Sequence, residues 1–329
     1  MEIIATLNPK STFIRDVARK PAITGIRFNT SAEMDTSAYE LLKRLKDEVY
    51  PKDLWVDLKC RQLRVTEDAV IPKDSLKVSH RLTVRTPTEM WYKESIEDKT
   101  KGTIEEVYIP LKLERVEGWG FVAGGSRLKV QAPPGTEVHF GRGAAVSIMD
   151  PSLKVHGYLT KRDKEFIDAA KQLDMHKYMI SFVEQDSDLA DIVARDPKAE
   201  ILAKIESNRG LNFVENVYPK SKYKEHVTLM AARGDMYVWL DKPHYILNAT
   251  KKIIKADPNA YGASRIMESL TRIKPEQMPD CADITDVGYL LELGYRNFLL
   301  GDAICYDKQR LSMAIGILDA IMRDYGSTL

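Results

Sequence analysis

Eight short apolar segments, each followed by a stretch with helical patterning, constrain the fold of this chain more than any other feature. The segments cover residues 3–6, 23–28, 54–57, 178–182, 201–205, 228–232, 260–263 and 297–300. Amphipathic stretches with a helical period of about 3.6 residues lie between them, among them residues 36–49, 161–173, 282–293 and 311–325. Strands that alternate with helices in this way predict a closed parallel (β/α)8 barrel of the α/β class rather than an open sheet.

The alternation stops between about Val65 and Val155, where short alternating runs are separated by Pro and Gly turn signals. We therefore expect a barrel built from residues 1–65 and 156–329, with a small β-barrel domain inserted at residues 66–155. An insertion after the third strand lies at the catalytic rim of such a barrel, so a lid-like role is plausible.

Composition excludes several classes of partner. The 49 basic and 48 acidic residues leave no net field that would attract nucleic acid or an anionic membrane surface. The three cysteines lack the spacing of a zinc site or a disulfide framework, and the opening residues do not form a signal peptide. These features predict a cytoplasmic protein without a membrane span.

Two charged residues, Lys204 and Glu206, stand two positions apart at the end of the segment 201–205. Because alternate residues of a strand face the same side, both side chains are expected to point toward the barrel mouth. The next strand ends in ARGD, so Asp235 could join Glu206 in holding a hard cation such as Mg²⁺ or Mn²⁺. A structural salt bridge at Lys204 and a helix cap at Asp235 would explain the same residues.

A second polar group ends the second and third predicted strands. Period-2 alternation places Arg27, Asn29 and Ser31 on one face, a set that suits a phosphate and a cation together. The segment WVDLKCRQLR concentrates charge just before the insertion, which predicts a phosphate-binding cluster of Asp57, Lys59, Arg61 and Arg64. A solvated charged surface would give the same pattern.

Ser264 follows the seventh predicted strand, where its hydroxyl could donate or relay a proton, although most serines at such positions cap helices. The six histidines show no metal-binding spacing such as HExxH, and each is expected to be structural or exposed. The glycines of VAGGSR and GRGAA match neither a Walker loop nor a dinucleotide fingerprint.

These segments together resemble the pyruvate kinase family. In chain order, IATLNPKS, IRFNTSAE, VDLKCRQLR, ISFVEQDSD, KIESNRG, ARGDM, ASRIMES, DITDVG and LLGD are similar to successive family motifs. The similarity runs from residue 1 to about residue 325 and is weak in the insertion. It implies a TIM barrel whose active site lies at the strand ends.

The resemblance also implies roles for individual residues. Lys204 would stabilise the transferring phosphoryl group and the developing enolate, and Glu206 with Asp235 would bind Mg²⁺ or Mn²⁺. Arg27 would bind the substrate phosphate, and Ser264 replaces a threonine near the enolate face.

Two further groups of residues complete the predicted site. Additional substrate contacts are predicted at Lys59, Arg64 and the backbone of Ala232, Arg233, Gly234 and Asp235. The residues that match monovalent-cation ligands, for K⁺, are Asn29, Ser31 and Asp57.

Departures from the family pattern concentrate where the family approaches nucleotide. The family's TIGP turn reads TLNP, and the histidine after the RxNxS segment is Ala32. DTKGPEIR reads DLKCRQLR, and the usual LGVEIP after ARGD reads MYVWLD, which introduces Tyr237 and Trp239. Arg142 is the nearest candidate for the lysine of the family's inserted domain. We expect no C-terminal regulatory domain after the eighth helix.

The resemblance therefore implies a metal-dependent enzyme that acts on phosphoenolpyruvate or a pyruvate-like molecule, with ADP or another phosphoryl acceptor. Two alternatives stay open: a lyase that acts on a pyruvate enolate, and a binding protein that has lost catalysis. A nucleotide is a possible ligand. A homo-oligomer is also possible, because residues 270–287 resemble a region that packs subunits in the family.

Overall fold

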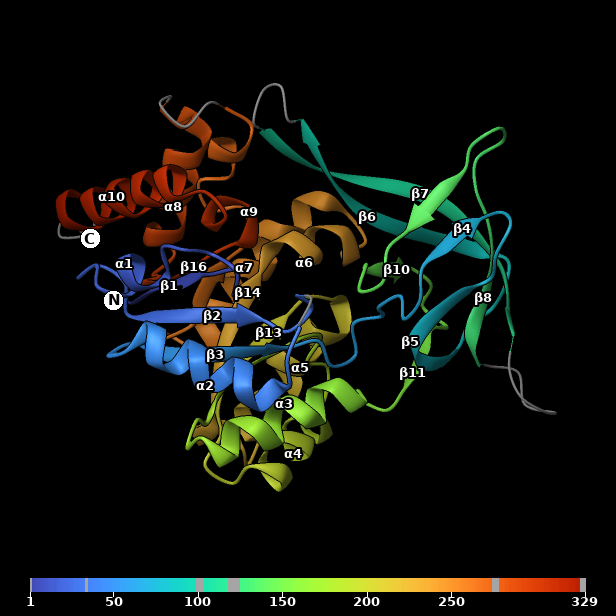
Figure 1. Ribbon diagram of the computed structural model, residues 1–329, viewed down its shortest axis with the longest axis horizontal. Helices are drawn as coiled ribbons and strands as arrows, with labels where there is room; N and C mark the ends of the chain where they lie inside the picture. The colour runs from blue at the N-terminus through green and yellow to red at the C-terminus, as the bar shows by residue number, and fades with distance from the viewer. Residues whose placement is uncertain (1, 33–34, 99–102, 118–124, 274–277, 326–329) are drawn as a thin grey trace. The chain divides into compact units, whose positions relative to one another are not determined.

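The structure is a computed structural model that describes residues 2–32, 35–98, 103–117, 125–273 and 278–325 (Figure 1). The chain divides into two compact units. The barrel unit comprises Met1–Leu58, Asp98–Thr103 and Arg162–Leu329, and the inserted unit comprises Lys59–Glu97 and Ile104–Lys161. This division assigns residues 59–65 and 156–161 to the inserted unit, whereas the sequence pattern had suggested that they belong to the barrel.

Eight parallel strands close the barrel in the order β1-β16-β15-β14-β13-β12-β3-β2. Each of the eight apolar segments overlaps one strand, which confirms the predicted (β/α)8 TIM barrel. The bounds of the strands are β1 (Glu2–Thr6), β2 (Gly25–Asn29), β3 (Asp53–Leu58), β12 (Lys177–Ile180), β13 (Glu200–Ile205), β14 (Val227–Ala232), β15 (Tyr261–Ala263) and β16 (Asn297–Leu300).

The strands are apolar because they are buried between the barrel interior and the surrounding helices. A buried cluster draws side chains from seven of the strands: Ile4, Trp55, Met179, Leu202, Met230, Tyr261, Ala263 and Leu299. The strand outside this cluster, β2, begins with Gly25, where an added Cβ would lie 3.1 Å from the indole of Trp55. A glycine at this position therefore makes room for the largest side chain of the cluster.

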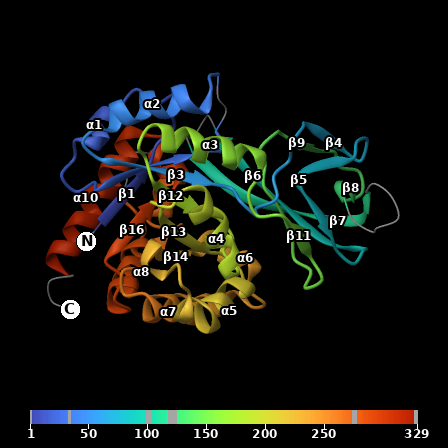
Figure 2. The ribbon, with the colours of Figure 1, turned by 90° about the horizontal axis from the view of Figure 1, so that it is seen from below.

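Helices surround the ring of strands (Figures 1 and 2), and the longer ones bury apolar side chains. In α2, for example, Leu41, Leu42, Leu45 and Val49 are buried, and the Ser37 hydroxyl caps the helix by accepting from the Glu40 N–H. None of the described helices is long and apolar enough to cross a membrane. The helices of the barrel unit are α1 (Ile14–Ala18), α2 (Ala38–Val49), α3 (Lys161–Gln172), α4 (Asp186–Arg195), α5 (Asn208–Asn216), α6 (Arg233–Trp239), α7 (Ile246–Ala256), α8 (Cys281–Glu292), α9 (Asp302–Cys305) and α10 (Lys308–Asp324), with short 3-10 turns η1 (Tyr218–Lys220), η2 (Lys224–His226), η3 (Pro243–Tyr245) and η4 (Glu268–Thr271).

The inserted unit contains only strands among its described elements. They form a six-stranded sheet, β10-β6-β7-β8-β5-β11, and a two-stranded sheet, β4-β9, where a small closed barrel was expected. Alternating burial along β5 and β8 gives the sheet one apolar face. The bounds are β4 (Ala69–Ile71), β5 (Leu76–Thr83), β6 (Thr88–Asp98), β7 (Thr103–Glu117), β8 (Gly125–Gln131), β9 (Val138–Phe140), β10 (Val146–Ile148) and β11 (Lys154–His156).

Candidate active site

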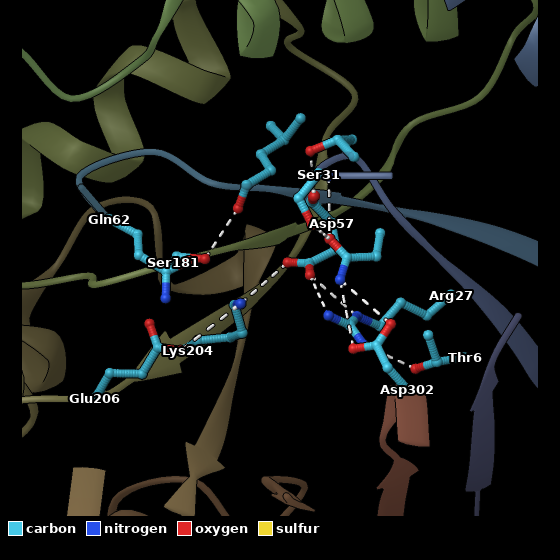
Figure 3. A network of polar contacts seen from close by, with 12 residues as sticks. Thr6, Arg27, Ser31, Asp57, Gln62, Ser181, Lys204, Glu206 and Asp302 are labelled. Carbon is cyan, nitrogen blue, oxygen red and sulfur yellow. Dashed lines mark hydrogen bonds and ion pairs between the residues drawn. The ribbon is translucent and has the colours of Figure 1, made fainter. Parts of the chain in front are cut away.

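The candidate site lies where the barrel strands end. Arg27 belongs to β2, Asp57 to β3 and Lys204 to β13, and Glu206 follows β13 directly. Asp302 comes two residues after β16 and begins α9. Because the strands are parallel, their carboxyl ends meet at one rim, and Figure 3 shows these side chains converging there.

Charges of alternating sign form a chain across this rim. Asp302 Oδ2 lies 3.1 Å from Arg27 Nη1, and Arg27 Nη2 lies 2.5 Å from Asp57 Oδ2. The other oxygen of Asp57 lies 3.1 Å from Lys204 Nζ, which in turn lies 3.7 Å from Glu206 Oε1. Desolvated charges of this kind are stable only when each is paired, so the chain of contacts explains how five charged residues share one site.

Arg27 is buried and held from three directions. Its Nε and Nη2 donate to Asp57 Oδ2, and its Nη1 donates to Thr6 Oγ1 at 2.8 Å and to Asp302. Burial lowers the pKa of Arg27, but Asp302 and Asp57 raise it and prevail, so the guanidinium stays charged. A fixed cation at this rim is suited to binding an anionic substrate group.

Lys204 stays charged in the same environment. Burial lowers its pKa, while Asp57 and Glu206 raise it, and the net pKa lies above the ordinary value of a lysine. The ammonium group is therefore a permanent positive charge that is shielded from water. A desolvated, fixed charge stabilises negative charge that develops during a reaction more strongly than the same group would in water.

Glu206 titrates near neutral pH. Burial raises its pKa to about 7, with a further contribution from the charge of Asp235, although Lys204 and the N–H of Phe182 lower it. The Phe182 N–H donates to Glu206 Oε2 at 2.7 Å and fixes the carboxylate. A buried carboxylate that is destabilised by a second carboxylate attracts a cation.

Glu206 and Asp235 are the pair predicted to hold a divalent metal, and the charge of Asp235 contributes to the raised pKa of Glu206. Two carboxylates leave coordination positions for water and substrate oxygens, which is the environment that Mg²⁺ and Mn²⁺ occupy in phosphate-binding enzymes. In the part of the chain that the structure describes, no cluster of three or more His, Cys, Asp or Glu side chains is arranged for a metal. A metal at this pair would thus need ligands from substrate or solvent.

The predicted monovalent-cation ligands are engaged with one another. Asn29 Oδ1 accepts from the N–H and the hydroxyl of Ser31 at 3.1 and 2.8 Å, while Asn29 Nδ2 donates to Asp302. The oxygens of Asp57 face Arg27 and Lys204. These contacts hold the three residues together at the strand ends, and their binding of K⁺ stays a prediction.

Arg233 has a structural role in this arrangement. Its guanidinium makes a bidentate ion pair with Asp286 at 2.7 and 2.8 Å, and it also donates to the carbonyl of Ser264. Arg233 therefore ties α6 to α8 and to the end of β15, and the predicted cradle for a substrate carboxylate would have to come from backbone.

Ser264 lies against Gly234. A Cβ atom added to Gly234 would stand 3.2 Å from the Cβ and 3.3 Å from the Oγ of Ser264. Ser264 and Arg265 both have left-handed backbone conformations, with φ of 61° and 57°. Non-glycine residues pay for such conformations, and they concentrate at functional sites. The glycine of ARGD thus leaves the space that the Ser264 side chain occupies.

Tyr237 and Trp239, which depart from the family pattern, pack on residues of the same rim. The guanidinium of Arg265 lies 5.2 Å from the centroid of the Tyr237 ring, and the Trp239 ring meets Phe182 edge-on with centroids 5.3 Å apart. Tyr237 is 43% exposed. Both aromatic rings pack beside residues that follow β12 and β15.

Lys59 and Arg64 belong to the inserted unit. Arg64 donates to the carbonyl of Gly143 at 2.9 Å and to Gln62 Oε1 at 2.5 Å, and Lys59 is buried. Their predicted contacts with a phosphate stay predictions. Arg142, the candidate for the family's inserted-domain lysine, donates its backbone N–H to Asp68.

Sequence reasoning missed Asp302 and Thr6 as members of the site. Asp302 was included only in the LLGD motif, and Thr6 only in the first strand, yet both contact Arg27. Each ends or follows a barrel strand. The rule that polar residues at the carboxyl ends of barrel strands meet would have singled out both positions.

The fold and the site together define a (β/α)8 barrel protein with a charged site at its strand ends. A family model described as pyruvate kinase, barrel domain, matches residues 124–294, which is more than half of the 329-residue chain. The chain belongs to the pyruvate kinase family, as the sequence motifs predicted. The pyruvate kinase of Borreliella burgdorferi is 27% identical over 165 residues, which are 48% of this chain and 33% of that protein. The match thus spans about a third of the length of that relative.

Proposed function

We propose that this chain is a metal-dependent enzyme that transfers the phosphoryl group of phosphoenolpyruvate to ADP or to another acceptor. The observation that carries the proposal is the buried, charged Lys204 between Asp57 and Glu206 at the strand ends. Phosphoryl transfer depends on positioning and charge neutralisation more than on covalent help, and this site offers both. Membership in the family supports the same substrate class.

In the proposed reaction the bond between phosphorus and the enol oxygen of phosphoenolpyruvate breaks as a bond from phosphorus to the acceptor oxygen forms. The bond electrons stay on the enol oxygen and leave a pyruvate enolate, whose charge Lys204 would stabilise. A divalent metal held by Glu206 and Asp235 would supply further neutralisation of the phosphate and enolate oxygens. Arg27 would hold the phosphate.

The enolate must then gain a proton at its methylene carbon to become pyruvate. Ser264 is the residue proposed to deliver or relay this proton, because the lack of a side chain at Gly234 leaves room for its hydroxyl beside the first residues of α6. The backbone of residues 232–235 would hold the substrate carboxylate, since the Arg233 side chain is committed to Asp286.

The acceptor is ADP or a different phosphoryl acceptor. Residues at the substrate end match the family pattern, whereas those near its nucleotide side differ, as at Ala32. ADP and a different acceptor are therefore both retained. A cytoplasmic location is part of the same proposal and agrees with three cysteines that are all free thiols.

The test is ³¹P NMR of the purified protein with phosphoenolpyruvate, Mg²⁺, K⁺ and ADP. ATP should form with the unaltered chain, should not form with Lys204→Met, and should form normally with the matched control Lys252→Met, whose lysine is exposed on α7. Exchange of pyruvate methyl protons with solvent measures the enolate step without any acceptor. If proton exchange depends on Lys204 but no ATP forms from ADP, the result would support an acceptor other than ADP. The absence of both proton exchange and ATP formation would refute the proposal.

A further inference from the structure

Arg27 is the residue proposed to bind the substrate phosphate. Its guanidinium already contacts a partly exposed carboxylate of the chain itself, that of Asp302. Asp302 Oδ2 lies 3.1 Å from Nη1 of the guanidinium. Of the charges that raise the pKa of Arg27, Asp302 has the largest effect. Asp302 thus fills the role that a bound phosphate oxygen would fill (Figure 3).

The two carboxylates that contact Arg27 differ in their surroundings. The Asp57 side chain is completely buried and also contacts Lys204, so its removal from the guanidinium would leave charges unpaired. The Asp302 side chain is 33% exposed, and water can solvate it when it moves away. An entering anion would therefore exchange places with Asp302 rather than with Asp57.

The balance of charge leads to the same exchange. The single positive charge of Arg27 contacts two carboxylates, Asp57 and Asp302. A phosphate that entered without displacing a carboxylate would add negative charge to a site that already carries an excess, at a cost that grows in a desolvated environment.

We propose that Asp302 is an internal competitor of the substrate phosphate, and that the phosphate reaches Arg27 by displacing the Asp302 carboxylate. This inference rests on the proposed function for the identity of the substrate. Asp302 acts through Arg27 and is a positioning residue that sets how tightly the anion binds. Asn29 Nδ2 donates to Asp302 Oδ1 at 3.2 Å and helps to hold the carboxylate beside Arg27.

The experiment compares Asp302→Asn with the unaltered chain in the binding of inorganic phosphate and of phosphoenolpyruvate with Mg²⁺, by calorimetry. We expect Asp302→Asn to bind both anions about fivefold more tightly, since it removes a partly exposed competing charge. Asp319→Asn removes the same charge from the exposed surface of α10 and should leave both affinities unchanged.

A double-variant cycle separates competition at Arg27 from a general change of charge. In an Arg27→Gln background, Asp302→Asn should no longer improve phosphate binding, because the contested cation is absent. In steady-state assays, Asp302→Asn should lower KM more than it changes kcat. Thermal unfolding checks that each variant is folded, and Asp302→Ser serves as a second variant if Asp302→Asn unfolds.

Unchanged or weaker phosphate binding by folded Asp302 variants would overturn the inference, and ATP formation by the unaltered chain would show that the proposed function still stands. If Asp302→Asn binds phosphate more tightly only when Arg27 is present, and no form turns over phosphoenolpyruvate, competition at Arg27 is supported and the proposed reaction is refuted. If neither phosphate nor phosphoenolpyruvate binds to any form, both ideas are refuted.

Discussion

Protonation of Glu206 should compete with metal binding across the neutral range. The pKa of Glu206 is raised to about 7, first by burial and then by the charge of Asp235. A metal ligand must be deprotonated, so the apparent affinity depends on the fraction of Glu206 that is ionised. Near pH 6 this fraction is about one tenth and near pH 8 it is about nine tenths, so Mn²⁺ affinity should rise about tenfold between them.

The measurement is a titration of Mn²⁺ into the chain at several pH values, with free Mn²⁺ followed by electron paramagnetic resonance. Glu206→Gln should bind Mn²⁺ more weakly, and what affinity it retains should lose this pH dependence. Glu200→Gln removes an exposed carboxylate from the opposite end of β13 and should behave like the unaltered chain. An affinity that stays constant between about pH 6 and 8 would refute the assigned role of Glu206.

Two further predictions concern the rim and the opposite end of the barrel. Gly234→Ala should place a methyl group against the Ser264 hydroxyl. The rate of pyruvate proton exchange should fall while the melting temperature changes little; an exchange rate equal to that of the unaltered chain would contradict the role of Ser264 in the proton step. The pKa of His176 is lowered by burial but raised overall by Asp196 and Asp174. Its contribution to stability is present below the unfolded pKa of about 6.5 and is lost as pH rises through the higher folded pKa. Denaturant titrations should show this pH dependence in the unaltered chain and not in His176→Gln.

The barrel could be predicted because its pattern is local. Each strand is a short apolar run and each helix is amphipathic, so the alternation is visible without knowing what contacts what. The family motifs singled out Arg27, Lys204 and Glu206, which the structure brings into one chain of contacts. The bounds of the inserted unit were less well defined, since short strands and turns leave weak signals.

Contacts between strand ends could not be predicted, because they depend on how the barrel closes. Asp57 lies 147 positions before Lys204 in the sequence, and Asp302 is separated from Arg27 by 275 positions. The sequence alone presents Asp57 as a cation ligand, whereas the fold places it between two cationic side chains.

The amino-acid sequence by itself determined the eight-stranded barrel, the inserted β unit and the residue types at the strand ends, since these follow from local hydrophobic periods and motifs. Only the tertiary structure decided which charges neutralise one another. Closure brings Asp57 and Asp302 to Arg27 and Asp286 to Arg233, and burial of the two guanidinium groups makes it costly to leave either one without an anion.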